Sequence, residues 1–189
     1  SKLSTTPTGL KKSHPMLYVD LSTIAKGFGV DEVAEILEQR GIEDYLVEIG
    51  GEMRVRGERG DGSEWLIAIE KPVTTERAVQ KVVSIGTNAV ATSGDYRNYY
   101  EEDGKRYSHL IDPRTGWAVK GRRQVTLIAK KGVTADSWAS AASVQPVPEA
   151  LRVIGERRDL GLRILVERDG AIREYYAGGL QHLFCKDKK

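Results

Sequence analysis

Apolar residues recur along the chain at two spacings, one typical of helices and one typical of strands. Between Thr23 and Arg40 they return every three or four positions, which predicts a helix that ends at Gly41. Further along, short runs rich in β-branched and aromatic residues predict strands, with glycine, aspartate and proline between them. The expected strands are Tyr45–Ile49, Glu52–Arg56, Trp65–Ile69, Val82–Ile85, Ala89–Thr92, Arg106–Ile111 and Val125–Ala129.

The last third of the chain continues with longer elements. Ala135–Val144 and Pro148–Arg157 have helical spacing, and Leu162–Glu167 with Ile172–Tyr176 predicts a closing hairpin around Asp169–Gly170. The helices do not alternate regularly with the strands, which disfavours a doubly wound parallel sheet. The pattern therefore predicts an α+β fold with a mixed, mainly antiparallel sheet and packed helices.

Two weaker signals concern the start of the chain and one turn. Residues 1–16 form a polar lead-in, and the apolar run Met16–Val19 after it is expected to end a strand. Gly60–Ser63 predicts the turn of a hairpin between its two flanking strands. The domain itself is expected to span residues 17–189.

Composition narrows the possible functions. The chain has 189 residues, of which 40% are hydrophobic, so it suits one globular domain and is neither disordered nor collagen-like. Its 29 Lys and Arg residues against 27 Asp and Glu give a formal net charge of +2. This balance disfavours a nucleic-acid partner, so any phosphate must be recognised locally.

No apolar run reaches the length of about 18 residues that would span a bilayer. The single cysteine, Cys185, excludes an internal disulfide and a cysteine-based zinc site.

The first chemically distinctive segment is Asp20–Gly29, at the start of the first predicted helix. The hydroxyl groups of Ser22 and Thr23, the free N–H groups of the first turn and the ammonium of Lys26 together favour a phosphate. The alternative is an ordinary capped helix, because serine and aspartate often accept backbone N–H groups at helix starts. The segment does not match the Gly-x-x-x-x-Gly-Lys-Ser/Thr phosphate loop, since Lys26 precedes its glycine.

Two further segments place glycine beside polar groups. Glu48–Glu52 contains a double glycine between two predicted strands, which would let a ligand approach the backbone; a β-bulge or tight turn is the alternative. Thr92 and Ser93 supply a pair of hydroxyl groups beside Gly94, and such a pair can bind a phosphate or the edge of a ring.

A histidine and a turn sequence follow shortly afterwards. His109 has a side chain that can exchange a proton near neutral pH. The segment Asp112–Gly116 is typical of a turn between strands, and a turn there is compatible with a site beside it.

The last distinctive segment belongs to the predicted helix Ala135–Val144. Asp136 and Ser140 are four residues apart and therefore lie on one face of a helix. A carboxylate and a hydroxyl at this spacing can supply two oxygens to Mg²⁺, which usually keeps waters and takes substrate phosphate as further ligands. The alternative is capping by Thr134 or Asp136.

Five of these segments occur in an order that resembles the ApbE family, the FAD:protein FMN transferases or flavin transferases. The resemblance runs from about Val19 to the end of the chain. The segments that carry it are Asp20–Phe28, Glu48–Glu52, Ala91–Gly94, His109–Gly116 and Ala135–Ser140. Several ordered motifs are far more specific than any one of them alone.

The resemblance implies a T-fold-related architecture and a defined reaction. The FMN moiety of FAD would be transferred to a Thr or Ser hydroxyl of an acceptor protein, with Mg²⁺ required and AMP released. At the matching positions, the resemblance implies FAD-binding residues Asp20, Lys26, Ile111, Thr92, Ser93 and Gly94. It implies Mg²⁺ ligands at the backbone oxygen of Thr23 and at Asp136 and Ser140, and catalytic residues His109, which would assist deprotonation of the acceptor, and Asp112.

The resemblance also implies a setting and partners. The expected setting is the bacterial cell envelope, on the periplasmic side of the inner membrane, with the full-length protein as a lipoprotein. The expected partners are FAD and an acceptor subunit of a membrane redox complex.

This chain departs from the family pattern in three respects. Ser140 stands where many relatives have threonine, and Ala139 stands where some have an acidic residue. Family members usually carry a further N-terminal segment that contributes to the flavin pocket. Residues 17–189 are therefore expected to be the central and C-terminal portion of the domain.

Two other functions fit the same residues. A pyrophosphatase would split FAD into FMN and AMP, with water replacing the acceptor hydroxyl. A noncatalytic flavin-binding or assembly module would keep the pocket and lack turnover, and Ala139 motivates this alternative. Release of AMP without an acceptor distinguishes the first alternative from transfer, and bound FAD that stays intact indicates the second.

Overall fold

The computed structural model describes residues 2–71, 79–94, 99–102, 105–119, 123–168 and 171–185, and its centre is a six-stranded sheet. All neighbouring strands in this sheet are antiparallel. In spatial order they are β14 (Ala171–Ala177), β13 (Gly161–Arg168), β12 (Arg123–Ala129), β7 (Ala89–Gly94), β4 (Glu52–Arg56) and β3 (Tyr45–Ile49). The expected α+β fold with a mainly antiparallel sheet is confirmed.

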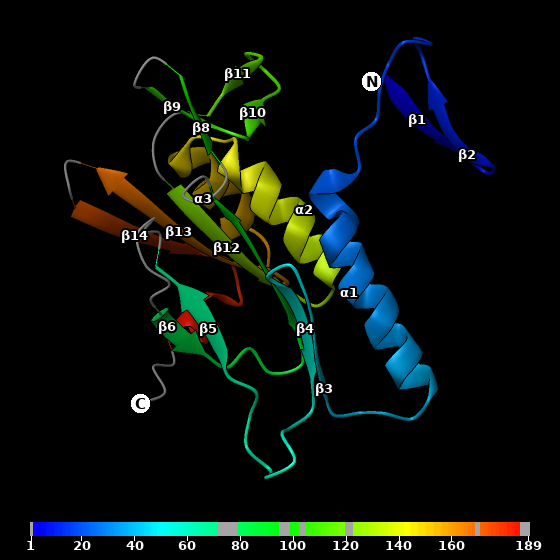
Figure 1. Ribbon diagram of the computed structural model, residues 1–189, viewed down its shortest axis with the longest axis vertical. Coiled ribbons are helices and arrows are strands. Elements are labelled where there is room, and N and C mark those ends of the chain that lie inside the picture. Colours follow the sequence, from blue (N-terminus) through cyan, green and yellow to red (C-terminus); the bar gives the residue numbers. More distant parts are fainter. Residues whose placement is uncertain are drawn as a thin grey trace.

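Three helices cover one face of the sheet (Figure 1). They are α1 (Ser22–Gln39), α2 (Gly132–Ser143) and α3 (Val147–Gly155). Along the central strand β12, Val125, Leu127 and Ala129 are fully buried in a core that they share with α2 and α3. The residue between them, Ile128, packs in a separate core, because successive side chains of a strand point to opposite faces.

The second core lies on the other face, beneath a separate antiparallel pair of strands. These are β5 (Ile67–Glu70) and β6 (Val79–Val83). A short 3-10 helix near the end of the chain, η1 (Gln181–Phe184), packs in the same core. Phe184 is fully buried there and packs with Ile67 and Ile69 of β5. The sheet is therefore covered on both faces, which explains why the central strand β12 is buried on both sides, including the polar residues Gln124 and Thr126.

Three small two-stranded pairs complete the described structure. They are β1 (Leu3–Thr6) with β2 (Gly9–Lys12), β8 (Tyr99–Glu102) with β9 (Lys105–Ser108), and β10 (Ile111–Asp112) with β11 (Trp117–Ala118). The first pair shows regular structure inside the lead-in, where Thr6 Oγ1 donates to the Gly9 carbonyl oxygen at 3.0 Å. The run Met16–Val19 is not a strand, contrary to expectation, and lies between this hairpin and α1.

Most predicted elements are confirmed within a few residues. The strands Tyr45–Ile49 and Glu52–Arg56 have the expected bounds, and α1 begins and ends one residue earlier than expected. The closing hairpin is confirmed by the pairing of β13 with β14, while Asp169–Gly170 lies outside the described residues. Among the described residues, none of the helices has both the length and the apolar character of a membrane span.

Two further predictions about strands are wrong. Gly60–Ser63 does reverse the chain, because Glu58 pairs with Glu64, but β5 pairs with β6 and not with β4. The expected strand Arg106–Ile111 is interrupted before β10, since Ser108 Oγ accepts the N–H group of Leu110 at 3.1 Å. A local side-chain bond thus replaces the strand pairing at this position.

Candidate active site

The first two helices cross at a point where both carry glycine. A Cβ atom at Gly27 of α1 would lie 2.4 Å from the carbonyl oxygen of Gly132, and a Cβ atom at Gly132 would lie 2.6 Å from that of Gly27. Glycine is required at both positions because the backbones touch. The first turns of α2 therefore lie directly against the N-terminal half of α1, which carries Lys26.

Asp136 faces this helix crossing from the second turn of α2. It is only 5% exposed, and its Oδ2 accepts the backbone N–H group of Gly27 at 2.9 Å. Burial raises the pKa of Asp136, and the bond from Gly27 and the charge of Lys26 partly oppose that effect. The capping alternative is wrong, because α2 begins at Gly132, and neither Thr134 nor Asp136 stands at its N-cap.

Lys26 forms an ion pair with Glu52, at the start of β4. Its Nζ lies 2.8 Å from Oε1 and 2.7 Å from Oε2, and it also donates to the carbonyl oxygen of Gly50 at 3.4 Å. Glu52 is 2% exposed; burial raises the pKa of its carboxyl, Lys26 opposes the increase, and the charge of Asp136 adds to it. Glu52 was not among the residues that the sequence assigned to the site, although it ends the Glu48–Glu52 segment.

Lys26, Glu52 and Asp136 thus form one cluster in which two carboxylates face a single ammonium. When all three are ionised, the cluster carries one more negative than positive charge. Such a cluster attracts a cation, and the exposed ammonium of Lys26 can turn toward an anion without leaving the helix start.

A cavity of about 490 Å³ opens beside Lys26. Thr92 and Gly94 of β7 line it, together with β5 and the turn Gly50–Gly51. Both glycines of this turn have positive φ, 56° and 97°, and join the paired residues Ile49 and Glu52. The tight-turn interpretation is therefore correct, and the same turn borders the cavity.

The turn Asp112–Gly116 lies elsewhere, at the C-terminal end of α2. Asp112 binds Arg114 through two contacts, from Nε to Oδ1 at 2.9 Å and from Nη2 to Oδ2 at 2.7 Å. These bonds, with the N–H group of Arg114, lower the pKa of Asp112 to about 2. Arg114 Nη2 also donates to the carbonyl oxygen of Val144 at 2.8 Å, which attaches the turn to the end of α2.

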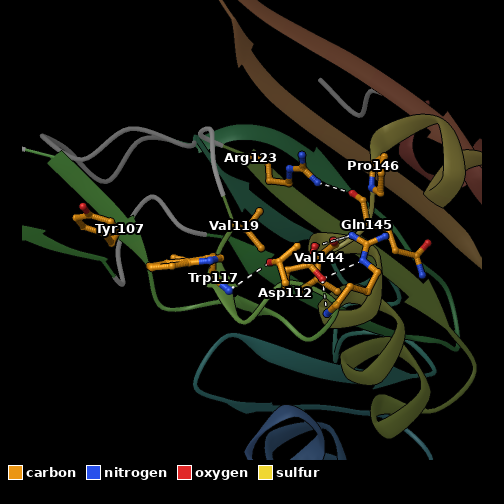
Figure 2. A pocket seen from close by; sticks show the side chains of 11 residues that line it. Tyr107, Asp112, Trp117, Val119, Arg123, Val144, Gln145 and Pro146 are labelled. Carbon is orange, nitrogen blue, oxygen red and sulfur yellow. Dashed lines mark hydrogen bonds and ion pairs between the residues drawn. The ribbon is translucent and has the colours of Figure 1, made fainter.

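A larger cavity, of about 1090 Å³, lies beside this turn (Figure 2). Tyr107, Asp112 and Trp117 line one side, and Arg123 and Pro146 line another. Arg123 Nη1 donates to the carbonyl oxygens of Gln145 at 2.6 Å and Ser143 at 3.2 Å. Two arginines therefore bind the free carbonyl groups at the C-terminal end of α2, where positive charge is favourable.

The structure divides the expected site residues into two groups. Around the helix crossing lie Lys26 and Asp136, with Thr92 and Gly94 lining the adjacent cavity. Around the Asp112 turn lie the exposed residues His109 and Ile111. Helix α2 connects the two groups, because Asp136 lies near its start and Arg114 binds the carbonyl oxygen of Val144 at its end. Val144 is eight residues beyond Asp136, or about 12 Å along a helix.

The remaining expected residues lie near the first group. Asp20 Oδ1 accepts the N–H group of Ser22 at 2.8 Å, and the bonds from Ser22 lower the pKa of Asp20. Thr23 is exposed in the first turn of α1, and Ser140 is half-buried one turn after Asp136. Ser93 pairs with Val125 inside the sheet.

The oxygen ligands predicted for a metal at Asp136 are few, which fits the usual coordination of Mg²⁺ in proteins. In the part of the chain that the structure describes, no three His, Cys, Asp or Glu residues form a metal-binding group. Of the predicted metal ligands, Asp136 and Ser140 lie one turn apart on α2 and Thr23 lies in the first turn of α1, while Ala139 packs in the core between α2 and the sheet. Mg²⁺ usually keeps several waters and takes phosphate oxygens, so few protein ligands are enough.

Comparisons of the sequence with known proteins all point to the same family. The model of the ApbE family matches residues 1–164. An FAD:protein FMN transferase of Vibrio cholerae is 47% identical over 94% of this chain and 53% of its own length. Its counterpart in Escherichia coli strain K12 is 39% identical over 95% of this chain and 51% of its own length.

Solved structures agree with the sequence comparison. The flavin transferase ApbE from Vibrio cholerae has a TM-score of 0.85 at 43% identity, covering 96% of this chain and 58% of that one. The ApbE protein from Thermotoga maritima has a TM-score of 0.82 at 28% identity, covering 100% and 60%. The chain spans about half the length of the curated relatives it matches.

Proposed function

Because the chain belongs to the ApbE family, we propose that it carries the phosphate- and metal-binding part of an FAD:protein FMN transferase. The acceptor hydroxyl oxygen would form a bond to the phosphorus of the FMN moiety, the bond from that phosphorus to the AMP oxygen would break, and AMP would leave. The cluster of Lys26, Glu52 and Asp136 at the helix crossing carries this proposal. It combines an exposed cation for phosphate, Lys26, with a buried carboxylate for a metal, Asp136.

Phosphoryl transfer depends mainly on positioning and on neutralising charge. Asp136, the Ser140 hydroxyl and the backbone oxygen of Thr23 would hold Mg²⁺, which supplies charge neutralisation at the pyrophosphate when it is bound. Lys26 would leave Glu52 and bind a phosphate oxygen, and the positive end of α1 would favour the same group. Thr92, Ser93 and Gly94 would border the flavin half of the substrate. Ile111, beside the Asp112 turn, would contact FAD from that side.

We assign different roles to His109 and Asp112. A pKa of about 2 leaves Asp112 ionised and bound to Arg114 at neutral pH, so it does not suit proton transfer. Asp112 would instead hold the turn that follows His109, and His109 would accept the proton of the acceptor hydroxyl.

The proposal is tested with the full-length protein, FAD, Mg²⁺ and an acceptor protein with a Thr or Ser target. Covalent flavin on the acceptor, measured by mass spectrometry, should form together with an equal amount of AMP. Asp136→Ala is expected to abolish this activity while circular dichroism shows an unchanged fold. AMP release without an acceptor adduct would favour the pyrophosphatase, and intact bound FAD would favour the noncatalytic module.

The resemblance also supports a proposed setting. The full-length protein would be a lipoprotein on the periplasmic side of the inner membrane and would flavinylate a subunit of a membrane redox complex. Fractionation of cells that express the full-length gene tests the setting, since recovery in the cytoplasmic fraction would contradict it.

A further inference from the structure

A third buried carboxylate, Asp31, lies at the same helix crossing but outside the cluster described above. It is 4% exposed and belongs to α1, one turn after Gly27. Its Oδ1 accepts the N–H group of Gly132 at 2.8 Å, and its Oδ2 accepts that of Val133 at 3.0 Å. These are the first two residues of α2, whose own N-cap residue, Lys131, provides no side-chain cap. Asp31 therefore caps α2 from another helix.

The bonds between the two helices are reciprocal. Asp31 of α1 accepts N–H groups at the start of α2, and Asp136 of α2 accepts the N–H group of Gly27 in α1. In each helix, the donor at Gly27 or Gly132 comes four residues before the acceptor. A shift of either helix along the other would break both sets of bonds at once.

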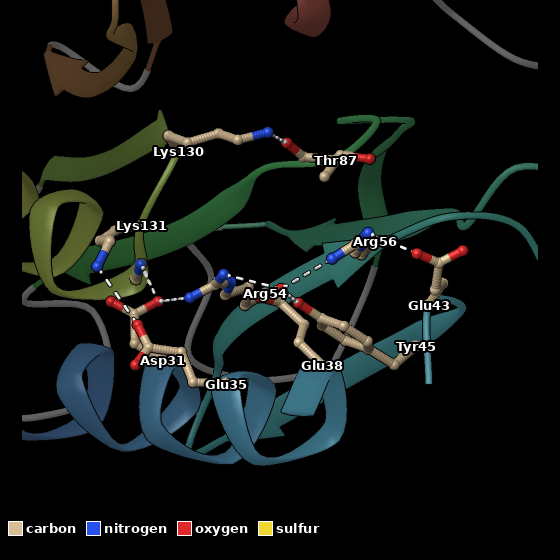
Figure 3. Close-up of polar contacts among 11 residues, drawn as sticks. Asp31, Glu35, Glu38, Glu43, Tyr45, Arg54, Arg56, Thr87, Lys130 and Lys131 are labelled. Atoms are coloured by element: carbon tan, nitrogen blue, oxygen red, sulfur yellow. Dashed lines mark hydrogen bonds and ion pairs between the residues drawn. The ribbon is translucent and has the colours of Figure 1, made fainter. Parts of the chain in front are cut away.

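Asp31 is itself held in place from the sheet (Figure 3). Arg54 of β4 donates to Asp31 Oδ1 at 3.0 Å and to Glu38 Oε1 at 3.1 Å. Glu38 in turn accepts the hydroxyl of Tyr45 on β3 at 2.5 Å. The position of α2 is thus fixed relative to α1 and the sheet by a connected set of ion pairs and hydrogen bonds.

We propose that Asp31 is a positioning residue for the metal site, which it serves without touching metal or substrate. The inference rests on the proposed function, in which Thr23 on α1 and Asp136 and Ser140 on α2 hold Mg²⁺ together. Ligands from two helices keep their spacing only if the helices keep their register. Asp31 fixes that register at the first turn of α2, one turn before Asp136.

The first test uses Asp31→Asn in the full-length protein, with Mn²⁺ as a paramagnetic probe of the Mg²⁺ site. Asparagine has one acceptor oxygen in place of the two that bind the N–H groups of α2, and it carries no negative charge to pair with Arg54. Loss of a group hydrogen-bonded directly to a metal ligand typically lowers metal affinity about 10- to 100-fold, and Asp31 acts one step further away, through the position of α2. We therefore expect the Kd for Mn²⁺, measured by electron paramagnetic resonance with FAD present, to rise about 10-fold.

Tyr45→Phe is the matched control. It removes a hydrogen bond from the same connected set, but on the side that joins α1 to β3, and it leaves the cap on α2 intact. Both variants are expected to lower Tm, whereas only Asp31→Asn should weaken Mn²⁺ binding. An unchanged Kd in Asp31→Asn would overturn the positioning role. The proposed metal site itself requires that the wild-type protein bind Mn²⁺ and that Asp136→Ala abolish this binding. Failure of either result would contradict the metal site and not only the role of Asp31.

A second measurement needs no metal. Amide hydrogen exchange should become faster at Gly27 in Asp31→Asn, because a shift of α2 would also withdraw Asp136 from that N–H group. A purely local cap would speed exchange only at Gly132 and Val133. Unchanged exchange at Gly27 would contradict the reciprocal coupling, whatever the effect on stability.

Discussion

At the scale of single residues, Asp136 meets two opposed requirements. In its proposed role as a Mg²⁺ ligand this carboxyl must be ionised, but burial raises its pKa above the ordinary value. A carboxyl whose pKa is raised by folding stabilises the folded state fully only below its unfolded pKa, about 3.9 for aspartate. That stability is lost as the pH rises through the higher pKa of the folded protein. Ionised Asp136 therefore destabilises the metal-free protein at neutral pH.

Asp136→Asn should separate the two requirements. The amide oxygen can still accept the N–H group of Gly27, but no charge is buried. We expect the metal-free variant to have a higher Tm than the wild type at pH 7, while transfer activity is lost. The difference in Tm should narrow as the pH falls through the raised pKa of Asp136 in the folded protein, where the wild-type carboxyl takes up its proton.

Asp61→Asn is the control for this experiment. Asp61 is exposed, and its hydrogen bonds to Ser63 lower the pKa of its carboxyl, so the substitution should give no gain in Tm at pH 7. A lower Tm for Asp136→Asn than for the wild type would show that the Gly27 bond and the charge of Lys26 outweigh burial.

At the scale of elements, the crossing of α1 and α2 has no space for a side chain. Gly27→Ala would place a Cβ atom 2.4 Å from the carbonyl oxygen of Gly132 and 2.6 Å from Cβ of Asp136. The helices would have to move apart, and such overpacking typically costs about 1–3 kcal/mol. Urea unfolding should show this loss of stability, and Mg²⁺-dependent activity should fall with it.

Gly155→Ala is the matched control for the crossing. Gly155 ends α3, and nothing lies within 4 Å of the position of its Cβ atom. The substitution should leave stability unchanged or raise it by up to about 1 kcal/mol, because alanine favours the helix. A similar loss in both variants would mean that the close contact of the helices is unimportant.

The same crossing shows what the sequence could and could not predict. Local spacing placed Asp136 and Ser140 on one helix face, and composition located the strands beside them. The start of α2 was placed three residues too late, because its cap, Asp31, is 101 residues away from Gly132 in the chain. The burial of Glu52 against Lys26 is likewise a tertiary contact, which no local pattern contains. The strand expected at His109 was interrupted for a different reason, a local bond from the N–H group of Leu110 to Ser108 Oγ.

At the scale of the whole molecule, α2 connects the two groups of site residues. Asp31 holds its first turn, and Arg114 and Arg123 hold its last carbonyl groups. The helix rests on the sheet through Ala135, Ala139 and Ala142, whose small side chains allow close packing. It therefore sets the distance between the proposed metal site and the turn that follows His109.

The distribution of charge leads to a prediction about ligand binding. The whole chain is close to balanced at +2, so attraction of anionic FAD depends on local groups. In the cluster, the carboxylates of Glu52 and Asp136 outnumber the ammonium of Lys26. FAD alone would approach this excess negative charge with its pyrophosphate, whereas bound Mg²⁺ would neutralise it. The two ligands are therefore expected to bind cooperatively.

Isothermal titration calorimetry of the full-length protein measures this coupling. Mg²⁺ should lower the Kd for FAD, and FAD should lower the Kd for Mg²⁺ by the same factor, on the order of 10-fold, because the coupling free energy is reciprocal. Chelation of the metal with EDTA should return the Kd for FAD to its metal-free value. In Asp136→Ala, the effect of Mg²⁺ on FAD binding should disappear, because the carboxylate that holds the ion is absent. Equal FAD affinity with and without Mg²⁺ in the wild-type protein would contradict a shared site for the metal and the pyrophosphate.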